Sequence, residues 1–330
     1  MLLSGDIGGT KTNLALVDIS GETLVVRLVK NYPSRKFASL HEIIAEFLRE
    51  VPATITSAAF GIAGPVVKGK SRLTNLTWEV DAQGVASQLR LERVGLVNDL
   101  QAIGYGTLRL KESEKLVLQP GAREEHGAIA VIAAGTGLGE GGLIWDGKRY
   151  RAIASEGGHT DFAPRNELEI DLLRFLQKRH TRVSYERIVA GPGVLSVYQF
   201  LRSRARHPEP AWLTASLAAG DPSAVISETA LKGSDPACVQ TMELFVSIYG
   251  AEAGNLALKL LSTGGVYVAG GIAPKILPLL TSGAFMTSLT TKGRQSDLIK
   301  RMPVEVVLND GVGLLGAAHV ALAIERDREF

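Results

Sequence analysis

Apolar runs of strand length open the chain and predict a β-β-β start. Residues 2–5, 14–19 and 23–29 are rich in Leu, Ile and Val, and polar or glycine-containing segments separate them. Ser20-Gly21 divides the second run from the third, and this pair is typical of a tight turn. We therefore predict three consecutive strands, the last two joined as a hairpin.

An amphipathic pattern follows and predicts alternating helices and strands. Ser39 precedes Glu42 by three residues, which is the spacing of a helix-capping box, and the apolar residues that follow lie on one helical face. The remaining strands and helices of this half are expected at 57–60, 85–91, 94–97 and from Leu100 onward.

The second half repeats this order of elements. Three strands around glycine turns are expected at 127–134, 142–145 and 150–153. Asn166 with Glu169 offers a second capping box. Further helices and strands are expected at 194–201, 242–261, 266–269 and 304–310. The last strand closes on Asn309-Asp310 as an earlier one closes on Asn98-Asp99, so we predict a duplicated β-β-β-α-β-α unit.

Two lobes follow from this duplication and from the length of the chain. A single hydrophobic core seldom supports 330 residues. We expect a small α/β lobe of residues 1–108 plus 312–330 and a large α/β lobe of residues 109–311, with a cleft between them. A last helix over 313–324 is expected to pack on the first lobe. Segment 206–236, with several prolines, is expected to be an excursion on the larger lobe.

Composition narrows the class of protein. Apolar residues make up 45% of the chain and charged residues 21%, the balance of a folded globular protein. A net charge of +2 with scattered basic residues predicts no nucleic-acid partner, and no apolar run is long enough to predict a membrane span. Cys238 is the only cysteine, which excludes a disulfide or a multi-thiolate zinc site within one chain. We expect a buried free thiol and a cytoplasmic protein.

Glycine turns are the first candidate for chemistry, because several backbone N–H groups of such a turn can point at one phosphate. A P-loop is excluded, since Thr10 separates Gly9 from Lys11 and a strand follows. The run GLGEGG at 137–142 matches the dinucleotide-binding pattern but continues as a strand. A protein-kinase loop lacks its His-Arg-Asp and Asp-Phe-Gly partners. Two hairpin turns, at 5–10 and 134–137, remain as a candidate polyphosphate clamp.

Polar residues after the strands are the second candidate. Asp99 ends a strand at the lobe boundary and is a candidate general base for phosphoryl transfer to an alcohol. A helix cap is the alternative for Asn98-Asp99. The glycines of Glu156-Gly-Gly-His159 argue against a helical metal site, whereas carboxylate and imidazole suit the hydroxyls of a sugar. Glu186 precedes Arg187, and a glutamate in this position is more often a surface charge.

These segments together resemble the sugar kinase, actin and Hsp70 superfamily. The two glycine turns and GGVYVAGG at 264–271 are similar to its phosphate hairpins and adenosine segment. The resemblance implies an α/β, two-lobe, ribonuclease-H-like (actin-like ATPase) fold with a central cleft. Six further motifs resemble the bacterial glucokinase family over nearly the whole chain, namely GIAGP at 61–65, TNLTW at 74–78, VND at 97–99, EGGHTDFAP at 156–164, SYER at 184–187 and AGPG at 190–193.

The resemblance to glucokinases implies ATP-dependent phosphorylation of the 6-hydroxyl of glucose, with Asp99 accepting the proton. The implied glucose-binding residues are Asn75, Asn98, Asp99, Glu156, His159 and Glu186. The implied nucleotide-binding residues are Asp6, Gly8, Gly9, Thr10, Lys11, Gly135, Thr136, Gly137, Gly270 and Gly271. Asp6 is also the implied residue for the magnesium ion of Mg-ATP, and a homodimer is common in the family.

The first hairpin departs from the glucokinase pattern. GGTKT at 8–12 looks more like the repressor and kinase family of the same superfamily. That family carries a cysteine-rich zinc segment, and its repressors begin with a DNA-binding helical domain; a single cysteine and a strand from residue 2 argue against both. A kinase for another hexose or amino sugar stays open, as does a sugar or nucleotide sensor without turnover. ADP or polyphosphate as the phosphoryl donor also stays open.

Overall fold

The computed structural model describes residues 1–21, 23–73, 76–205 and 208–326, and its backbone divides into two compact units. The first unit contains residues 1–114 and 151–154 and the segment that starts at Asn309. The second unit contains residues 115–150 and 155–308. Each unit is built on its own β-sheet.

The first unit has a five-stranded sheet in the order β3-β2-β1-β4-β8. Its strands are β1 (Leu2–Ile7), β2 (Lys11–Ser20), β3 (Thr23–Pro33), β4 (Ser57–Ile62) and β8 (Gly95–Asn98). Strand β2 pairs antiparallel with both β1 and β3, whereas β1, β4 and β8 run parallel. The predicted β-β-β start is confirmed; β1 and β3 extend beyond their predicted carboxyl ends, and β2 extends beyond both of its predicted ends.

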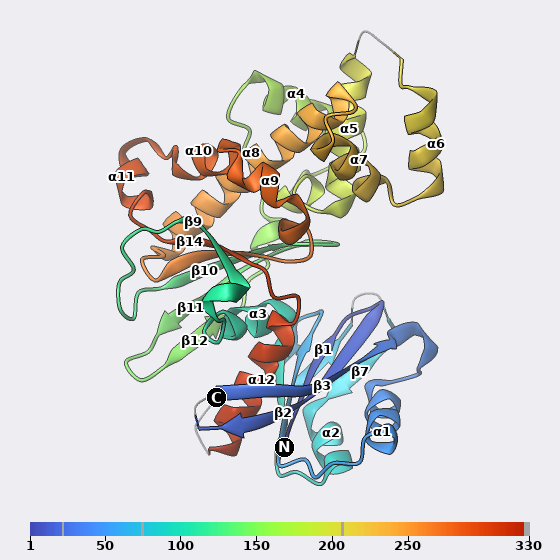
Figure 1. Cartoon of the computed structure of the whole chain (residues 1–330), viewed down its shortest axis with the longest axis vertical. Coiled ribbons are helices and arrows are strands. Elements are labelled where there is room, and N and C mark those ends of the chain that lie inside the picture. The colour runs from blue at the N-terminus through green and yellow to red at the C-terminus, as the bar shows by residue number, and fades with distance from the viewer. Residues whose placement is uncertain (22, 74–75, 206–207, 327–330) are drawn as a thin grey trace. The chain divides into compact units, whose positions relative to one another are not determined.

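Helices and a small sheet complete the first unit (Figure 1). The helices are α1 (Leu40–Glu50), α2 (Ala82–Leu89), α3 (Asp99–Thr107) and α12 (Val312–Glu325), with the 3-10 turns η1 (Ser34–Lys36) and η2 (Glu112–Glu114). Apolar residues of α1 and α2 share one core with those of β1, β2 and β4. The small antiparallel sheet consists of β5 (Val66–Val67), β6 (Lys70–Arg72) and β7 (Glu79–Asp81). Strands of two or three residues carry too little periodicity to be predicted.

The second unit repeats the strand order of the first. Its sheet has the order β12-β11-β10-β13-β14-β9, and its first five strands correspond to β3-β2-β1-β4-β8. The strands are β9 (Lys115–Gln119), β10 (Ile129–Ala134), β11 (Leu138–Trp145), β12 (Tyr150–Ile153), β13 (Gly265–Ala269) and β14 (Val304–Val307). The predicted duplication is therefore confirmed. One detail was wrong, because β14 ends at Val307 and Asn309-Asp310 lies beyond it.

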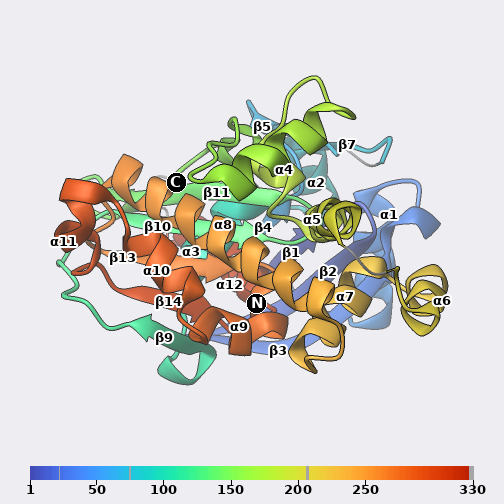
Figure 2. The ribbon, with the colours of Figure 1, turned by 90° about the horizontal axis from the view of Figure 1, so that it is seen from above.

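Helices cover the sheet of the second unit, and the 25-residue α8 (Pro236–Leu260) crosses it (Figure 2). Phe245 and Tyr249 of α8 are fully buried and pack with Phe285 of α10. The other helices are α4 (Glu167–Gln177), α5 (Gly191–Arg204), α6 (Ala211–Ala219), α7 (Pro222–Leu231), α9 (Leu277–Thr281), α10 (Ala284–Thr290) and α11 (Ser296–Ile299). Four 3-10 turns are η3 (Gly157–His159), η4 (Tyr185–Arg187), η5 (Ala273–Ile276) and η6 (Gly293–Gln295).

Both predicted capping boxes are half right. Ser39 Oγ and Asn166 Oδ1 accept hydrogen bonds from the N–H groups of Glu42 and Glu169, as the motif requires. The reciprocal bonds differ, because each glutamate accepts from the residue before the cap. Ala38 N–H donates to Glu42, and Arg165 N–H donates to Glu169. Each pair still satisfies a backbone donor at a helix start.

The final helix, α12, belongs to the first unit. The sequence predicted a helix over 313–324, and α12 spans one residue more at each end. Its backbone accepts a hydrogen bond in the core of that unit, from Ser57 Oγ of β4 to the carbonyl of Ala321 at 2.8 Å. Val320 packs so closely on β8 that a Cβ on Gly95 would lie 2.7 Å from its methyl group. None of the described helices is long and apolar enough to cross a membrane.

Candidate functional site

Several predicted site residues of the first unit lie along one edge of its sheet. Asp6 of β1 stands opposite Gly61 of β4, and Ile62 of β4 stands opposite Asn98 of β8. Because these three strands are parallel, their carboxyl ends meet at the same edge. That edge therefore carries Asp6, the β1–β2 turn with Gly8, Gly9, Thr10 and Lys11, and the pair Asn98 and Asp99.

The β1–β2 turn is fixed by Ser34, a fully buried residue of η1. Gly8 N–H donates to the carbonyl of Lys11 at 3.0 Å and closes the turn. Ser34 Oγ donates to the carbonyl of Gly8 at 2.7 Å, and Ser34 N–H donates to the carbonyl of Thr10 at 3.1 Å. Ser34 carried no signal in the sequence, since its contact with the turn depends on the long β2–β3 hairpin.

Asp6 lies in β1, just before this turn, and its buried position disfavours the charged form of its carboxyl group. Asn13 Nδ2 of β2 donates to Asp6 Oδ2 at 3.3 Å. Burial raises the pKa of the Asp6 carboxyl, while the hydrogen bond from Asn13 and the positive charge of Lys11 oppose this rise. Asn13 Oδ1 is buried and has no hydrogen-bond partner among the described residues. A cation at this position would compensate both oxygen atoms.

Asn98 and Asp99 stand at the junction of β8 and α3, and Asn98 is the helix cap. Leu100 N–H donates to Asn98 Oδ1 at 2.9 Å, and Asn98 N–H donates to Gln101 Oε1 at 3.1 Å. Asn98 Nδ2 also donates to the carbonyl of Gly64 at 3.2 Å. Asp99 is the first residue of α3, and its Oδ1 also accepts from Leu100 N–H at 2.8 Å. The positive end of the α3 dipole favours a charged carboxylate there.

In the second unit, two glycine turns lie side by side at the ends of the parallel strands β10 and β13. Gly135 N–H donates to the carbonyl of Gly137 at 2.9 Å and closes the β10–β11 turn around Thr136. Gly270 has a φ of +86°, and a Cβ there would lie 2.3 Å from the carbonyl oxygen of Ala134. Gly270-Gly271 therefore depends on glycine for its close approach to β10. Gly191 N–H donates to the carbonyl of Gly135 at 2.8 Å and ties the start of α5 to the same turn.

Glu186 joins the β10–β11 turn to the predicted sugar-binding residues. Its Oε2 accepts from Leu138 N–H at 3.1 Å, and a Cβ on Gly137 would lie 2.5 Å from that oxygen. Its Oε1 lies 3.7 Å from His159 Nδ1, and His159 Nε2 lies 3.9 Å from Glu156 Oε2. Glu156, His159 and Glu186 thus form one group within the second unit. Glu186 is half-buried, so the surface-charge interpretation does not describe it.

The Glu156–His159 turn packs closely against β11, and this is possible because its two central residues are glycines. A Cβ on Gly158 would lie 1.9 Å from the carbonyl oxygen of Leu138, and one on Gly157 would lie 2.5 Å from Glu140 Oε2. Thr160 and Phe162 pair with the segment before Glu186, since Tyr185 N–H donates to Thr160 O and Phe162 N–H donates to Val183 O. This pairing brings residues 27 positions apart in the chain into one group.

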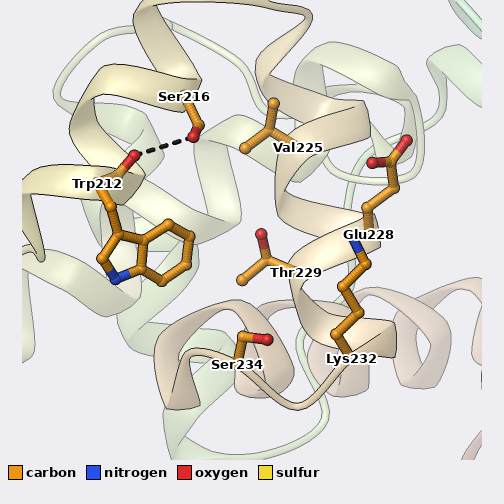
Figure 3. A pocket seen from close by; sticks show the side chains of 7 residues that line it. All are labelled: Trp212, Ser216, Val225, Glu228, Thr229, Lys232 and Ser234. Atoms are coloured by element: carbon orange, nitrogen blue, oxygen red, sulfur yellow. Dashed lines mark hydrogen bonds between the residues drawn. The ribbon is translucent and has the colours of Figure 1, made fainter.

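Two cavities in the second unit contain none of the predicted site residues. One of about 430 Å³ lies between α6 and α7 and is lined by Trp212, Ser216, Val225, Glu228, Thr229, Lys232 and Ser234 (Figure 3). The other, of about 890 Å³, involves α4, α5 and α8. Asn75 lies outside the described residues. Within the part of the chain that the structure covers, no three His, Cys, Asp or Glu side chains gather as a metal site.

Comparisons with known proteins agree with this fold. The family model for glucokinase matches residues 3–324. A glucokinase of Nostoc sp. strain PCC 7120 is 46% identical over 96% of this chain and 98% of its own length. The crystal structure of a glucokinase from an Antarctic psychrotroph superposes with a TM-score of 0.85 at 29% identity, covering 97% of this chain and 98% of that one.

A more distant structure supports the same fold. A repressor-and-kinase (ROK) family glucokinase from Streptomyces griseus, in complex with glucose and AMPPNP, superposes with a TM-score of 0.67 at 21% identity, covering 97% and 99% of the two chains. The duplicated sheets and the two glycine turns are those of a kinase with the actin-like ATPase fold. The matched family model and the identity to curated relatives are more specific: the chain belongs to the glucokinase family.

Proposed function

We propose that this protein transfers the γ-phosphoryl group of ATP to the 6-hydroxyl of glucose, with Asp99 as the general base. The observation that carries the proposal is the position of Asp99 beside Asn98, on the same sheet edge as Asp6 and the Gly8–Lys11 turn. Asp99, which would accept the hydroxyl proton, and the turn that would bind the phosphates are then both held by the same β-sheet. The family match and the glucose and AMPPNP bound by the Streptomyces griseus enzyme support this choice of substrates.

The sugar is assigned to polar side chains of both units. Asn98, Glu156, His159 and Glu186 offer donors and acceptors in fixed directions, which suits neighbouring hydroxyls of a pyranose. Asn75 is part of the same proposed set. Asp99 accepts the proton of the attacking hydroxyl and orients its oxygen toward the phosphorus atom. A charged carboxylate can accept hydrogen bonds from two hydroxyl groups, and this would disfavour sugars that lack one of those hydroxyls.

The nucleotide is assigned to the glycine turns. In the first unit these are Gly8, Gly9, Thr10 and Lys11, and in the second Gly135, Thr136 and Gly137, with Gly270 and Gly271 at the adenosine. Free N–H groups of such turns stabilise phosphoryl oxygens in the transition state. Asp6 and the unpartnered Asn13 Oδ1 are hard oxygen ligands, which suit Mg²⁺ held mainly by phosphates. The bound ion would neutralise phosphate charge.

The wider organisation is part of the same proposal. We assign residues 1–108 plus 312–330 to a small lobe and residues 109–311 to a large lobe, and the two compact units of the backbone support this division. The protein is further proposed to be cytoplasmic. It is also proposed to form a homodimer, and light scattering of the purified chain can test this oligomeric state.

Coupled turnover assays test the function directly. We expect ADP to form from ATP only when a hexose is present, with a kcat/KM for glucose well above that for fructose, mannose or glucosamine. ADP and polyphosphate are tested as alternative donors in the same assay. A preference for another sugar would reassign the substrate, and binding of glucose without any turnover would indicate a sensor in place of an enzyme.

A further inference from the structure

A buried carboxyl group without a hydrogen-bond partner lies directly behind the proposed sugar-binding turn. Glu140 of β11 is 1% exposed, and neither of its carboxylate oxygens has a hydrogen-bond partner among the described residues. An ionised carboxylate in such a place loses its hydration, and none of the described residues donates a hydrogen bond to it in return. An ionised glutamate at this position therefore destabilises the fold, so we ask whether its protonation state serves a function.

The groups that face Glu140 favour its neutral form. From α8 it meets Glu252, which is fully buried, and the hydroxyl of Tyr249 lies on the same side. Lys259 is the nearest positive charge, and it is bound to Glu252 Oε1 at 3.2 Å with its own side chain half exposed. Burial and the charge of Glu252 raise the pKa of Glu140 to about 8, Lys259 opposes this rise, and the hydrogen bond that a protonated Glu140 donates to Glu252 adds to it. Glu140 therefore holds a proton at neutral pH.

Glu140 supports the Glu156–His159 turn through Gly157. The Gly157 backbone approaches Glu140 Oε2 so closely that a Cβ would lie 2.5 Å from it. Two positions earlier on the same strand, Leu138 supports Gly158 with its carbonyl group and binds Glu186 with its N–H group. Residues 138–140 of β11 are thus the surface on which all three proposed sugar-binding side chains of this unit are placed.

Glu252, which faces Glu140, is connected to the same side chains through a second set of hydrogen bonds. Glu252 Oε2 accepts from Asn255 Nδ2 at 2.8 Å, and the same amide group donates to the hydroxyl of Tyr185 at 3.2 Å. Tyr185 directly precedes Glu186. Lys292 completes this network, because its Nζ donates to Asn255 Oδ1 at 2.6 Å, and burial lowers the pKa of Lys292 to about 8. A charge change at Glu140 therefore reaches Glu186 as well as the turn.

We propose that protonated Glu140, packed against Glu252, is a positioning residue for the glucose-binding side chains, and that loss of its proton weakens glucose binding in alkaline solution. The inference rests on the proposed function, which assigns Glu156, His159 and Glu186 to glucose. When Glu140 ionises, two like charges face each other in a region of low dielectric, and one of them must move or become hydrated. The Gly157 backbone lies against the Glu140 carboxyl group, so such a movement would displace it.

Steady-state kinetics between pH 6.5 and 9.5 test the proposal. In the wild type, KM for glucose should rise by at least about fivefold from pH 7 to 9.5, while kcat at saturating glucose changes by less than about twofold. Glu140→Gln keeps the shape of the side chain and cannot ionise, so its KM should stay nearly constant over this range. Glu305→Gln is the matched control, a buried glutamate of β14 paired with Lys115 and Arg123, and it should keep the alkaline rise.

Calorimetry tests the same proposal without turnover and without a variant. Glucose titrated into the wild type near pH 8.5, in two buffers of different ionisation enthalpy, should bind with uptake of a fraction of one proton. Binding without proton uptake, or an alkaline rise in KM that persists in Glu140→Gln, would overturn the role of Glu140 and leave the proposed function intact. Absence of glucose binding at every pH would overturn both.

Discussion

At the end of β8, two neighbouring side chains have different tasks. Asn98 closes the start of α3, and Asp99 is the first residue inside that helix. Asp99 can therefore be replaced without removing the cap, so a change in activity can be separated from a change in folding. This makes it the most informative single residue for the proposed chemistry.

Asp99→Asn should lower kcat by about 10²- to 10⁴-fold, because an amide cannot accept the hydroxyl proton. ATP affinity, measured with a fluorescent nucleotide analogue, should change by less than about threefold, since the glycine turns are unchanged. Asp18→Asn in the exposed ion pair with Arg27 is the control and should keep full activity. Unchanged turnover in Asp99→Asn would exclude the residue as the base.

Gly137→Ala should weaken glucose binding through Glu186. The added Cβ would lie 2.5 Å from Glu186 Oε2, so the carboxylate must leave Leu138 N–H. Loss of a hydrogen bond to a charged group corresponds to about a 10- to 100-fold rise in KM for glucose. Gly220→Ala, where a Cβ finds only ordinary contacts, should behave as the wild type in the same assay. Equal KM values for the two variants would contradict this coupling.

Individual site residues differ in how well the sequence predicts them. Asn98-Asp99 follows an apolar strand directly, so its place at a sheet edge could be predicted from local pattern alone. Glu186 could not be distinguished from a surface charge, because its contacts depend on the pairing of Thr160 with Tyr185. Glu140 gave no signal, since in the sequence it is one polar residue among glycines, and only the approach of α8 buries it.

Among the elements, the β1–β2 hairpin shows how a flexible glycine turn becomes fixed. The Ser34 hydroxyl donates to the carbonyl of Gly8 and contacts Thr12 Oγ1 at 2.9 Å, and the Ser34 backbone N–H donates to Thr10, so one buried residue holds the whole turn. The turn is thus held in one conformation before any phosphate binds. Preorganised backbone donors lose less entropy on binding than mobile ones.

Ser34→Ala should loosen this turn. The Gly8 carbonyl loses its partner, at a cost of about 1–3 kcal/mol to the free energy of unfolding, and KM for ATP should rise while KM for glucose changes little. Urea denaturation and two-substrate kinetics measure the two effects. Ser87→Ala, which removes a hydroxyl that binds its own helix at Gln83, should stay within about 0.5 kcal/mol of the wild type. An unaltered KM for ATP in Ser34→Ala would show that the turn needs no such support.

Regular elements were predictable where their apolar pattern is long or repeated. The β-β-β starts, α1, α4 and the strand at 265–269 each combine such a pattern with a cap or a glycine turn. Within 206–236, α6 and α7 were not predicted. Leu213 and Ile226 are among the few of their residues that are fully buried, so most of each helix carries no apolar face. Their stability comes from tertiary contacts, which a local pattern does not contain.

On the scale of the whole molecule, the two units have separate cores with the same strand order. Cys238 is the only cysteine in the chain, and it is fully buried in the core of the second unit. Burial and the nearby Asp235 raise the pKa of its thiol to about 12. The thiol is therefore a natural reporter of the unfolding of that unit.

Reaction of Cys238 with a thiol reagent at pH 8 should be at least about 1,000-fold slower in the native protein than in urea. Glucose or ATP at 100 times its dissociation constant should slow the reaction by up to about 100-fold more, because a ligand lowers the population of the open form. The variant Ser87→Cys, with its thiol on exposed α2, should react at once. Rapid labelling of native Cys238 would mean that the second unit opens locally.

The first unit is completed by α12, a helix that lies far along the chain from the strands of this unit. The hydroxyl of Ser57 can donate its hydrogen bond only after Ala321, 264 positions further along the chain, has been synthesised. At about 5–20 residues per second, a ribosome needs on the order of tens of seconds to deliver that helix. During this interval the nascent amino-terminal sheet has one apolar face uncovered. Translation of this protein should therefore depend on a holding chaperone more than translation of a protein whose first domain is contiguous.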